Sequence, residues 1–306
     1  MSQNIDFCIP YFSSGIKALE YLISNLIITT TKFDRLRIIV SYHNNNELKI
    51  LQSSSIFKYI HKTIHAPIVE DDTILFKPSY NHSIALKYLM ENIESEIVVI
   101  SDFDIAILKY GWDEIIEHNL ENNYDIIGVT YPNFNFSFKS ISANDKSIIS
   151  FPTNLTFSKY QSLPNLVFFC TKNITIKNFF NNRLTNFHDF LLNGSLPFRI
   201  INSKKLESDN NLPLGSFQWL DTGYEIPEVI SNSKLSYMTL LYDYNQKILP
   251  TDMSENILNH PEIYLFPRIN VPFLVHFKKS SKKLGKNNLQ LEKNFDIISK
   301  FLKNIK

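Results

Sequence analysis

The chain has 306 residues and a mass of 35.7 kDa, which suits one α/β domain with appendages or a domain with a smaller companion. A net charge of +1 and a charged fraction of 20% exclude a strong attraction of the whole surface to nucleic acid or anionic lipid. The two cysteines lie in apolar runs and predict reduced, buried thiols instead of a disulfide framework. The sequence shows neither a signal peptide nor a transmembrane run, so we expect a soluble cytoplasmic protein. The abundance of Ile, Asn, Lys and Phe indicates an organism with an AT-rich genome or a virus-infected host cell as the source.

Apolar strands alternate with amphipathic helices through the first part of the chain. In chain order, we expect strands over 6–9, 36–40, 96–100 and 125–129, and helices over 15–26, 81–93 and 112–120. The run Ile97-Val98-Val99-Ile100 is continuous and β-branched, which is typical of a parallel strand covered on both faces. The alternation predicts βαβ units and an α/β fold with a mostly parallel sheet flanked by helices.

The pattern is less regular in the second part of the chain. We expect loops and short strands over 132–163, order again at 166–171, helices near 174–181 and 221–231, strands over 237–242 and 273–277, a basic loop at 280–286 and a terminal helix over 289–302. We therefore divide the chain into halves, 1–130 and 131–306, of one compact domain.

The strongest chemical signal is Asp102-Phe103-Asp104, which directly follows the central predicted strand. Ligands of open α/β sheets bind beyond the carboxyl ends of the strands. Carboxylates at i and i+2 leave such a strand end close together, and the bulky residue between them turns away. Two hard oxygens in this arrangement suit Mg²⁺ or Mn²⁺ with positions left for phosphate oxygens. An ordinary turn that contains two aspartates is the alternative.

Three segments together resemble the nucleotide-binding half of the GT-A glycosyltransferases, and most of all their inverting family 2 type. These segments are 81–86 (Asn-His-Ser-Ile-Ala-Leu), 95–104 with its Asp-Phe-Asp, and Gly111-Trp112. The segment 9–13 is similar to the first strand and loop of that family, and the resemblance covers roughly residues 5–130. It implies a GT-A (Rossmann-like) fold and transfer of a sugar, with inversion, from a nucleotide diphosphate-sugar to a hydroxyl acceptor.

The resemblance also implies roles for single residues. Pro10, Tyr11 and Phe12 would line the nucleoside pocket, and Asn81 would contact the donor. Asp104 would bind Mn²⁺ or Mg²⁺ directly, while Asp102 would reach the ribose or the metal. The half 1–130 would then bind the nucleotide sugar, and the half 131–306 would form the acceptor side.

The sequence departs from the family after the second predicted strand, where the family carries an acid that binds the base. This chain has Ser41-Tyr42-His43-Asn44 instead. His43 and Asn44 could hydrogen-bond a base edge in its place. The acidic run Glu70-Asp71-Asp72 could supply the missing acid or simply form a solvated loop. We expect a UDP-sugar as the donor.

Two late motifs fit the same scheme. His276 lies on an apolar predicted strand, so it is either a third metal ligand or a buried core histidine, and Lys278 would share its face and could meet the diphosphate. Asp221 precedes a predicted helix, so it is either the general base or a helix cap, with Glu225 as the reserve candidate. Trp219 would offer a platform to a sugar face or belong to the core.

Two other functions compete with sugar transfer. A sugar nucleotidyltransferase also combines a parallel sheet with metal carboxylates, but it usually has a Gly-rich basic loop after the first strand, where this chain has one glycine. A non-catalytic carbohydrate- or protein-binding module could use the same fold. The acceptor would be a hydroxyl of a glycan, protein or lipid. We expect no nucleic-acid partner, because the aromatic residues are not interleaved with a basic stripe.

Overall fold

A computed structural model of the chain describes residues 3–12, 15–68, 77–130, 164–180, 183, 226–243, 262–267, 271–277, 297–298 and 300. The segments 132–163 and 280–286 and most of the predicted terminal helix lie outside the described residues. Among the described residues, every helix is too short or too polar to cross a membrane.

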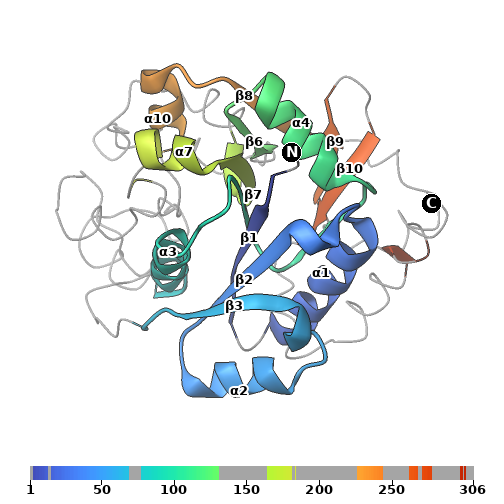
Figure 1. The fold of residues 1–306 in the computed structure, drawn as a ribbon, viewed down its shortest axis with the longest axis vertical. Helices are drawn as coiled ribbons and strands as arrows, with labels where there is room; N and C mark the ends of the chain where they lie inside the picture. Colours follow the sequence, from blue (N-terminus) through green and yellow to red (C-terminus); the bar gives the residue numbers. More distant parts are fainter. Residues whose placement is uncertain are drawn as a thin grey trace, which may run out of the picture.

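One ten-stranded sheet forms the centre of the described fold (Figure 1). From one edge to the other its strands are β3 (Ile60–His65), β2 (Leu36–Tyr42), β1 (Ile5–Pro10), β4 (Ile97–Ser101), β7 (Pro164–Lys172), β6 (Ile126–Thr130), β8 (Tyr237–Tyr242), β9 (Glu262–Phe266), β10 (Val271–His276) and β5 (Ile105–Ile107). The strands β3, β2, β1 and β4 are mutually parallel and β6 is parallel to β8, while β7, β9 and β5 run against their neighbours. The predicted α/β class with a mostly parallel sheet is confirmed.

Helices cover both faces of this sheet (Figure 1). The helical elements are α1 (Ile16–Thr29), η2 (Phe33–Arg35), α2 (Asn45–Ser53), η3 (Phe57–Tyr59), α3 (Lys77–Met90), α4 (Trp112–Asn122), α7 (Asn173–Thr175), the π-helical turn η4 (Ile176–Phe180) and α10 (Ile226–Ser233). Apolar residues of α1 and α4 pack on one face, and those of α3, η4 and α10 pack on the other. Strands from both halves of the chain share the sheet, and the division at residue 130 stays a prediction.

Strand β4 lies in the middle of the parallel part, and all five of its residues are buried. Val99 belongs to the core on the side of α1 and α4, whereas Val98 and Ile100 belong to the core on the side of α3. A strand with apolar side chains on both faces is stable only when both faces are covered, which is what its continuous β-branched sequence predicted. Residues 102–104 therefore leave the sheet from a rigid strand.

The short strand β5 begins directly after Asp104 and forms the edge of the sheet beside β10. In the antiparallel register of this pair, Ile105 lies opposite His276. The amide of Phe277 also donates to the carbonyl of Asp104 at 2.8 Å. This pairing brings His276, which lies 172 positions after Asp104 in the sequence (276 − 104), to the segment with the paired aspartates.

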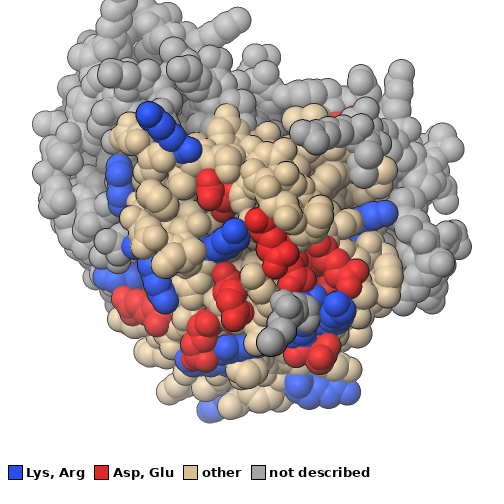
Figure 2. Space-filling view, turned by 45° about the horizontal axis from the view of Figure 1, so that its top comes forward, with Lys and Arg blue, Asp and Glu red and all other residues tan. Residues whose placement is uncertain are grey.

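Charged side chains are interspersed on the face of the molecule that Figure 2 displays, with acidic and basic groups next to one another. Several ion pairs join exposed groups, such as Lys32 with Glu114 at 3.3 Å and Lys62 with Glu94 at 3.6 Å. Exposed pairs of this kind contribute little to stability, typically about 0–1 kcal/mol each. Within each pair the positive and negative charges offset one another, in agreement with a net charge of +1.

The side chain of Asn25 connects α1 to the free side of β5. Its Nδ2 donates to the carbonyl of Ile107 at 2.9 Å, and the amide of Ile107 donates to its Oδ1 at 2.7 Å. An edge strand has no neighbour on one side to pair with its backbone groups. Because Asn25 is buried, water does not fill this role, and its two hydrogen bonds satisfy the backbone of Ile107 instead.

Replacement of Asn25 by Leu should therefore lower the free energy of unfolding by at least about 2 kcal/mol, because it leaves two backbone groups without partners. Urea denaturation measures the effect. Asn122→Leu at an exposed position of α4 is the matched control, since the Asn122 amide contacts only the carbonyl and Nδ1 of His118 in its own helix among the described residues, and it should change stability by less than about 0.5 kcal/mol. Equal, small effects of both substitutions would contradict the role of Asn25.

Candidate metal and nucleotide site

The two aspartates lie on the turn between β4 and β5, and their backbone is fixed on both sides. The amide of Asp102 donates to the carbonyl of Val167 on β7 at 3.1 Å. Phe103, between the aspartates, is buried, and its ring packs so closely on Gly15 that a Cβ there would lie 2.4 Å from it. The bulky residue thus turns into the core, as predicted, and the two carboxylates lie on the other side of the turn.

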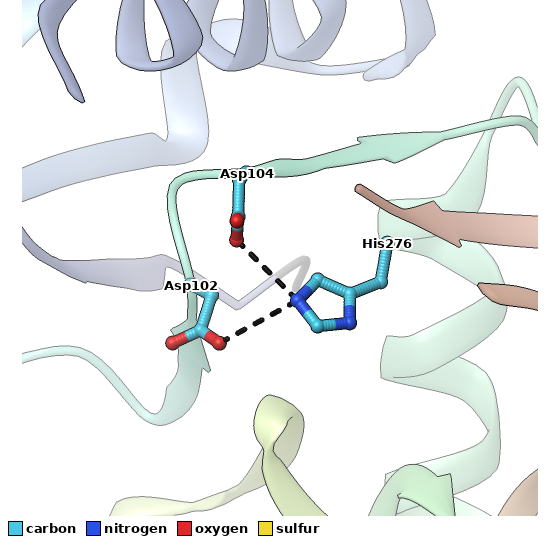
Figure 3. Close-up of side chains that lie close together, drawn as sticks. All are labelled: Asp102, Asp104 and His276. Carbon is cyan, nitrogen blue, oxygen red and sulfur yellow. Dashed lines mark ion pairs between the residues drawn. The ribbon is translucent and has the colours of Figure 1, made fainter. Parts of the chain in front are cut away.

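His276 at the end of β10 faces both carboxylates (Figure 3). Its Nε2 lies 3.4 Å from Oδ1 of Asp104 and 3.9 Å from Oδ2 of Asp102. One oxygen of each aspartate and one ring nitrogen lie within 4.8 Å of one another. His276 and Asp104 are buried, whereas the Asp102 side chain keeps 29% of its surface exposed. The group is therefore open on the side of Asp102.

This set of ligand atoms fits a divalent cation. Carboxylate oxygens are the ligands that Mg²⁺ and Mn²⁺ prefer, and an imidazole nitrogen is an acceptable third ligand for Mn²⁺. Ligands about 2.0–2.1 Å from one ion lie up to about 4 Å apart, so small side-chain rotations bring all three atoms onto one ion. Among the described residues, this is the group of acidic and histidine side chains that can hold a metal.

The acids around His276 determine its charge. Burial alone would lower the pKa of His276, but Asp104 at Nε2 and Glu262 at Nδ1 outweigh burial and raise the pKa to about 10. Without a cation, the ring is therefore an imidazolium between two carboxylates. A cation that binds to Nε2 takes the place of the proton there and is attracted by the same carboxylates.

Of the residues predicted to line the nucleoside pocket, the structure brings some together and places others in the core. The ring of Phe12, just after β1, stacks on the ring of His43, just after β2, with centroids 5.1 Å apart. Tyr11 is fully buried in the core on the side of α1, and burial raises the pKa of its phenol well above the ordinary value. Pro10 ends β1 and is buried. Phe12 and His43 thus share one place beyond the parallel strands, while Tyr11 points into the core.

Two further residues predicted to bind the nucleotide, Asn44 and Asn81, belong to helical segments. Asn44 is the N-cap of α2, and its side-chain oxygen accepts the amide of Glu47 at 3.0 Å. Asn81 lies in α3, and its side-chain oxygen is buried without a hydrogen-bond partner among the described residues. Contacts of these residues with a nucleotide stay predictions.

Four predicted site residues, Trp219, Asp221, Glu225 and Lys278, lie outside the described residues. The acidic run Glu70-Asp71-Asp72 lies outside them as well. Their roles therefore stay predictions.

Two residues that contact the metal group, Glu262 and His82, were not predicted from the sequence. Glu262 on β9 accepts a hydrogen bond from Nδ1 of His276 at 2.7 Å. Nε2 of His82, on α3, lies 3.5 Å from Oδ1 of Asp102. The only sequence signal for Glu262 is an acid at the start of an otherwise apolar stretch, and nothing in the sequence connects it with a histidine 14 positions later.

No protein-family model and no curated protein sequence matches this chain. Solved structures of similar fold include a mannosyltransferase from Pyrobaculum calidifontis, solved with GDP-Man and Mn²⁺, at 9% identity and a TM-score of 0.43 over 84% of this chain and 61% of that one. Residues 1–349 of S. aureus TarS match at 14% identity and a TM-score of 0.35, over 57% of this chain and 48% of that one. The glycosyltransferase GlyE of Streptococcus pneumoniae TIGR4 matches at 10% identity and a TM-score of 0.39, over 78% of this chain and 45% of that one.

TarS has also been solved with UDP and with UDP-GlcNAc. The alignments span less than two thirds of each of these three proteins. Similarity at this level carries no argument about function, which has to come from the site itself.

The charge of His276 predicts how cation binding depends on pH. Below about pH 10 the ring has to lose a proton before Nε2 can bind a cation, so affinity for Mn²⁺ should rise by about tenfold per pH unit between pH 6 and 8. Calorimetric titrations with Mn²⁺ in buffers of different ionisation enthalpy measure the released proton. Affinity that is independent of pH, with no proton released, would remove His276 from the ligand set.

Proposed function

We propose that the protein is a metal-dependent glycosyltransferase of the GT-A type that transfers a sugar from a nucleotide diphosphate-sugar to a hydroxyl group. One observation carries the proposal: Asp102, Asp104 and His276 converge beyond the carboxyl end of the central parallel strand. Ligands of open α/β sheets bind at this edge. Mn²⁺ or Mg²⁺ held by these three residues would neutralise the negative charge that develops on a leaving nucleoside diphosphate.

The remaining chemical roles belong to residues for which the sequence is the only support. Asp221 is the proposed general base that takes the proton of the acceptor hydroxyl, and Glu225 is its alternative. Lys278 would contact the diphosphate, and Trp219 would hold the face of a sugar. With one carboxylate as base and no covalent intermediate, the sugar would be transferred with inversion.

The protonation state of His43 bears on the base of the donor. A carbonyl oxygen can only accept, so Nδ1 of His43, 2.7 Å from the carbonyl of Ala66, carries a proton and donates it. Burial lowers the pKa of His43, which keeps the ring neutral and leaves Nε2 as an acceptor. This nitrogen is buried without a hydrogen-bond partner among the described residues. Uracil and guanine present a ring N–H to such an acceptor, whereas the corresponding ring nitrogens of cytosine and adenine carry no hydrogen and are acceptors themselves. We therefore propose UDP-sugar as the donor, with GDP-sugar as the alternative.

A sugar nucleotidyltransferase would use the same cation for a different reaction. It would join a nucleoside triphosphate to a sugar phosphate and release pyrophosphate, whereas a glycosyltransferase releases a nucleoside diphosphate from a nucleotide sugar. A non-catalytic module would bind a nucleotide sugar and release nothing. One assay with both substrate sets therefore separates the three functions.

Nucleoside diphosphate release from a panel of nucleotide sugars tests the proposal. Wild-type protein with Mn²⁺ should release diphosphate from at least one of them, and Asp104→Ala should abolish release while the melting temperature stays within a few degrees. Asp34→Ala, at an exposed position of η2, is the matched control and should keep full activity. Full activity of Asp104→Ala, or of wild type in excess chelator, would contradict the proposal.

The choice of base has a test of its own. With Mn²⁺ present, UDP or GDP should raise the melting temperature more than CDP or ADP, because CDP and ADP leave the acceptor Nε2 of His43 without a ring N–H donor, at a cost of about 1–3 kcal/mol. The matched ligand is UDP methylated at N3, in which a methyl group replaces the hydrogen of the N–H, and it should behave like CDP. His43→Phe keeps a ring next to Phe12 and should remove the difference between UDP and its methylated form. Equal binding of these two ligands to wild type would exclude His43 as the acceptor.

A further inference from the structure

Glu262 lies behind the metal group, on the far side of His276 from the two aspartates. In the antiparallel register of β9 and β10, Glu262 is directly opposite His276. Its Oε2 accepts from Nδ1 of His276 at 2.7 Å and from the hydroxyl of Tyr264 at 3.0 Å. Glu262 is 3% exposed and Tyr264 is 0% exposed, so this carboxylate is held inside the protein by two donors.

A buried carboxylate carries a high cost in free energy unless it has charged or hydrogen-bonding partners. If Glu262 served stability alone, an apolar residue at the same place in β9 would serve as well or better. Its position next to Nδ1 has a specific effect on the ring, however. A proton fixed on Nδ1 leaves Nε2 as the nitrogen that faces Asp102 and Asp104, and it prevents the ring from turning about its Cβ–Cγ bond.

We propose that Glu262 is a positioning residue for the divalent cation, and that Tyr264 in turn holds Glu262. The chain of contacts runs from the Tyr264 hydroxyl to the Glu262 carboxylate, from there to Nδ1 of His276, and through the ring to Nε2 at the aspartates. Histidines that bind metals commonly donate their second nitrogen to a carboxylate in this way, and loss of that partner typically weakens metal binding by about 10–100-fold. The inference rests on the metal site of the proposed function.

The register of β9 and β10 explains why the single carboxylate of Glu262 can hold the His276 ring in place. Residues directly opposite one another in an antiparallel pair have their side chains on the same face, and their Cβ atoms are about 4.5–5.5 Å apart. Tyr264, two residues further along β9, lies on the same face again. The three side chains therefore form a row on two neighbouring strands, and their relative positions are set by backbone hydrogen bonds.

The test is the affinity for Mn²⁺, measured by electron paramagnetic resonance of the free ion in the full-length protein with UDP present. Glu262→Gln preserves the size of the side chain and should weaken Mn²⁺ binding by about 10–100-fold per folded molecule. Tyr264→Phe removes only the second bond and should weaken it several-fold. Glu114→Gln on α4 removes one negative charge from an exposed position, 47% exposed, and should leave the affinity unchanged.

The outcomes separate this inference from the proposed function. Wild-type affinity in both Glu262→Gln and Tyr264→Phe, together with lowered melting temperatures, would make the row a purely structural feature and overturn the inference, while the metal site would stand. If Glu262→Gln does not fold, the Mn²⁺ affinity of Tyr264→Phe alone tests the inference. Absence of Mn²⁺ binding in wild type, with and without UDP, would overturn the metal site and the inference together.

Discussion

The antiparallel pairing of β5 with β10 is the constraint on which the candidate site depends. It places His276 opposite Ile105, one residue beyond Asp104, and the adjacent amide of Phe277 bonds to the carbonyl of Asp104. Because β10 also pairs with β9, the same register sets Glu262 behind His276. Backbone hydrogen bonds between three strands thus fix the ligand atoms and the acid behind them, and a cation would bind to a prearranged group with little ordering of side chains.

The parallel half of the sheet supplies the other requirement, a rigid strand that carries the aspartates. Burial of β4 on both faces holds residues 102–104 at its carboxyl end, and the packing of Phe103 against Gly15 separates the bulky side chain from the two carboxylates. On the edge of β5 that does not pair with β10, the side chain of Asn25 hydrogen-bonds the backbone of the strand. A site of this kind tolerates change in the loops around it better than change in β4, β5 or β10.

Much of this arrangement could be predicted from the sequence because it depends on local patterns. The β-branched run at 97–100 predicted a parallel strand covered on both faces, and the strand predicted at 237–242 has the same bounds in β8. The i, i+2 spacing predicted that the two carboxylates lie together. Six elements were not predicted: η2, η3 and β5 have three residues each and no measurable period, α2 is a short helix of mostly polar residues, and β3 and β9 have too weak an alternation of apolar and polar residues. The pairing of His276 with Glu262 joins different strands, and no periodicity within either strand encodes it. The roles of Asp221 and Lys278 stay predictions.

The most direct test of the account is the position of the cation itself. Crystals of the protein with Mn²⁺ and UDP, measured at a wavelength near the manganese absorption edge, locate the ion by its anomalous scattering. We expect one strong peak bonded to Asp104 and to Nε2 of His276, with Asp102 in contact with the ion or with the ribose and with phosphate oxygens in the remaining positions. Bound UDP without a manganese peak between these residues, or a peak held by other side chains, would contradict it.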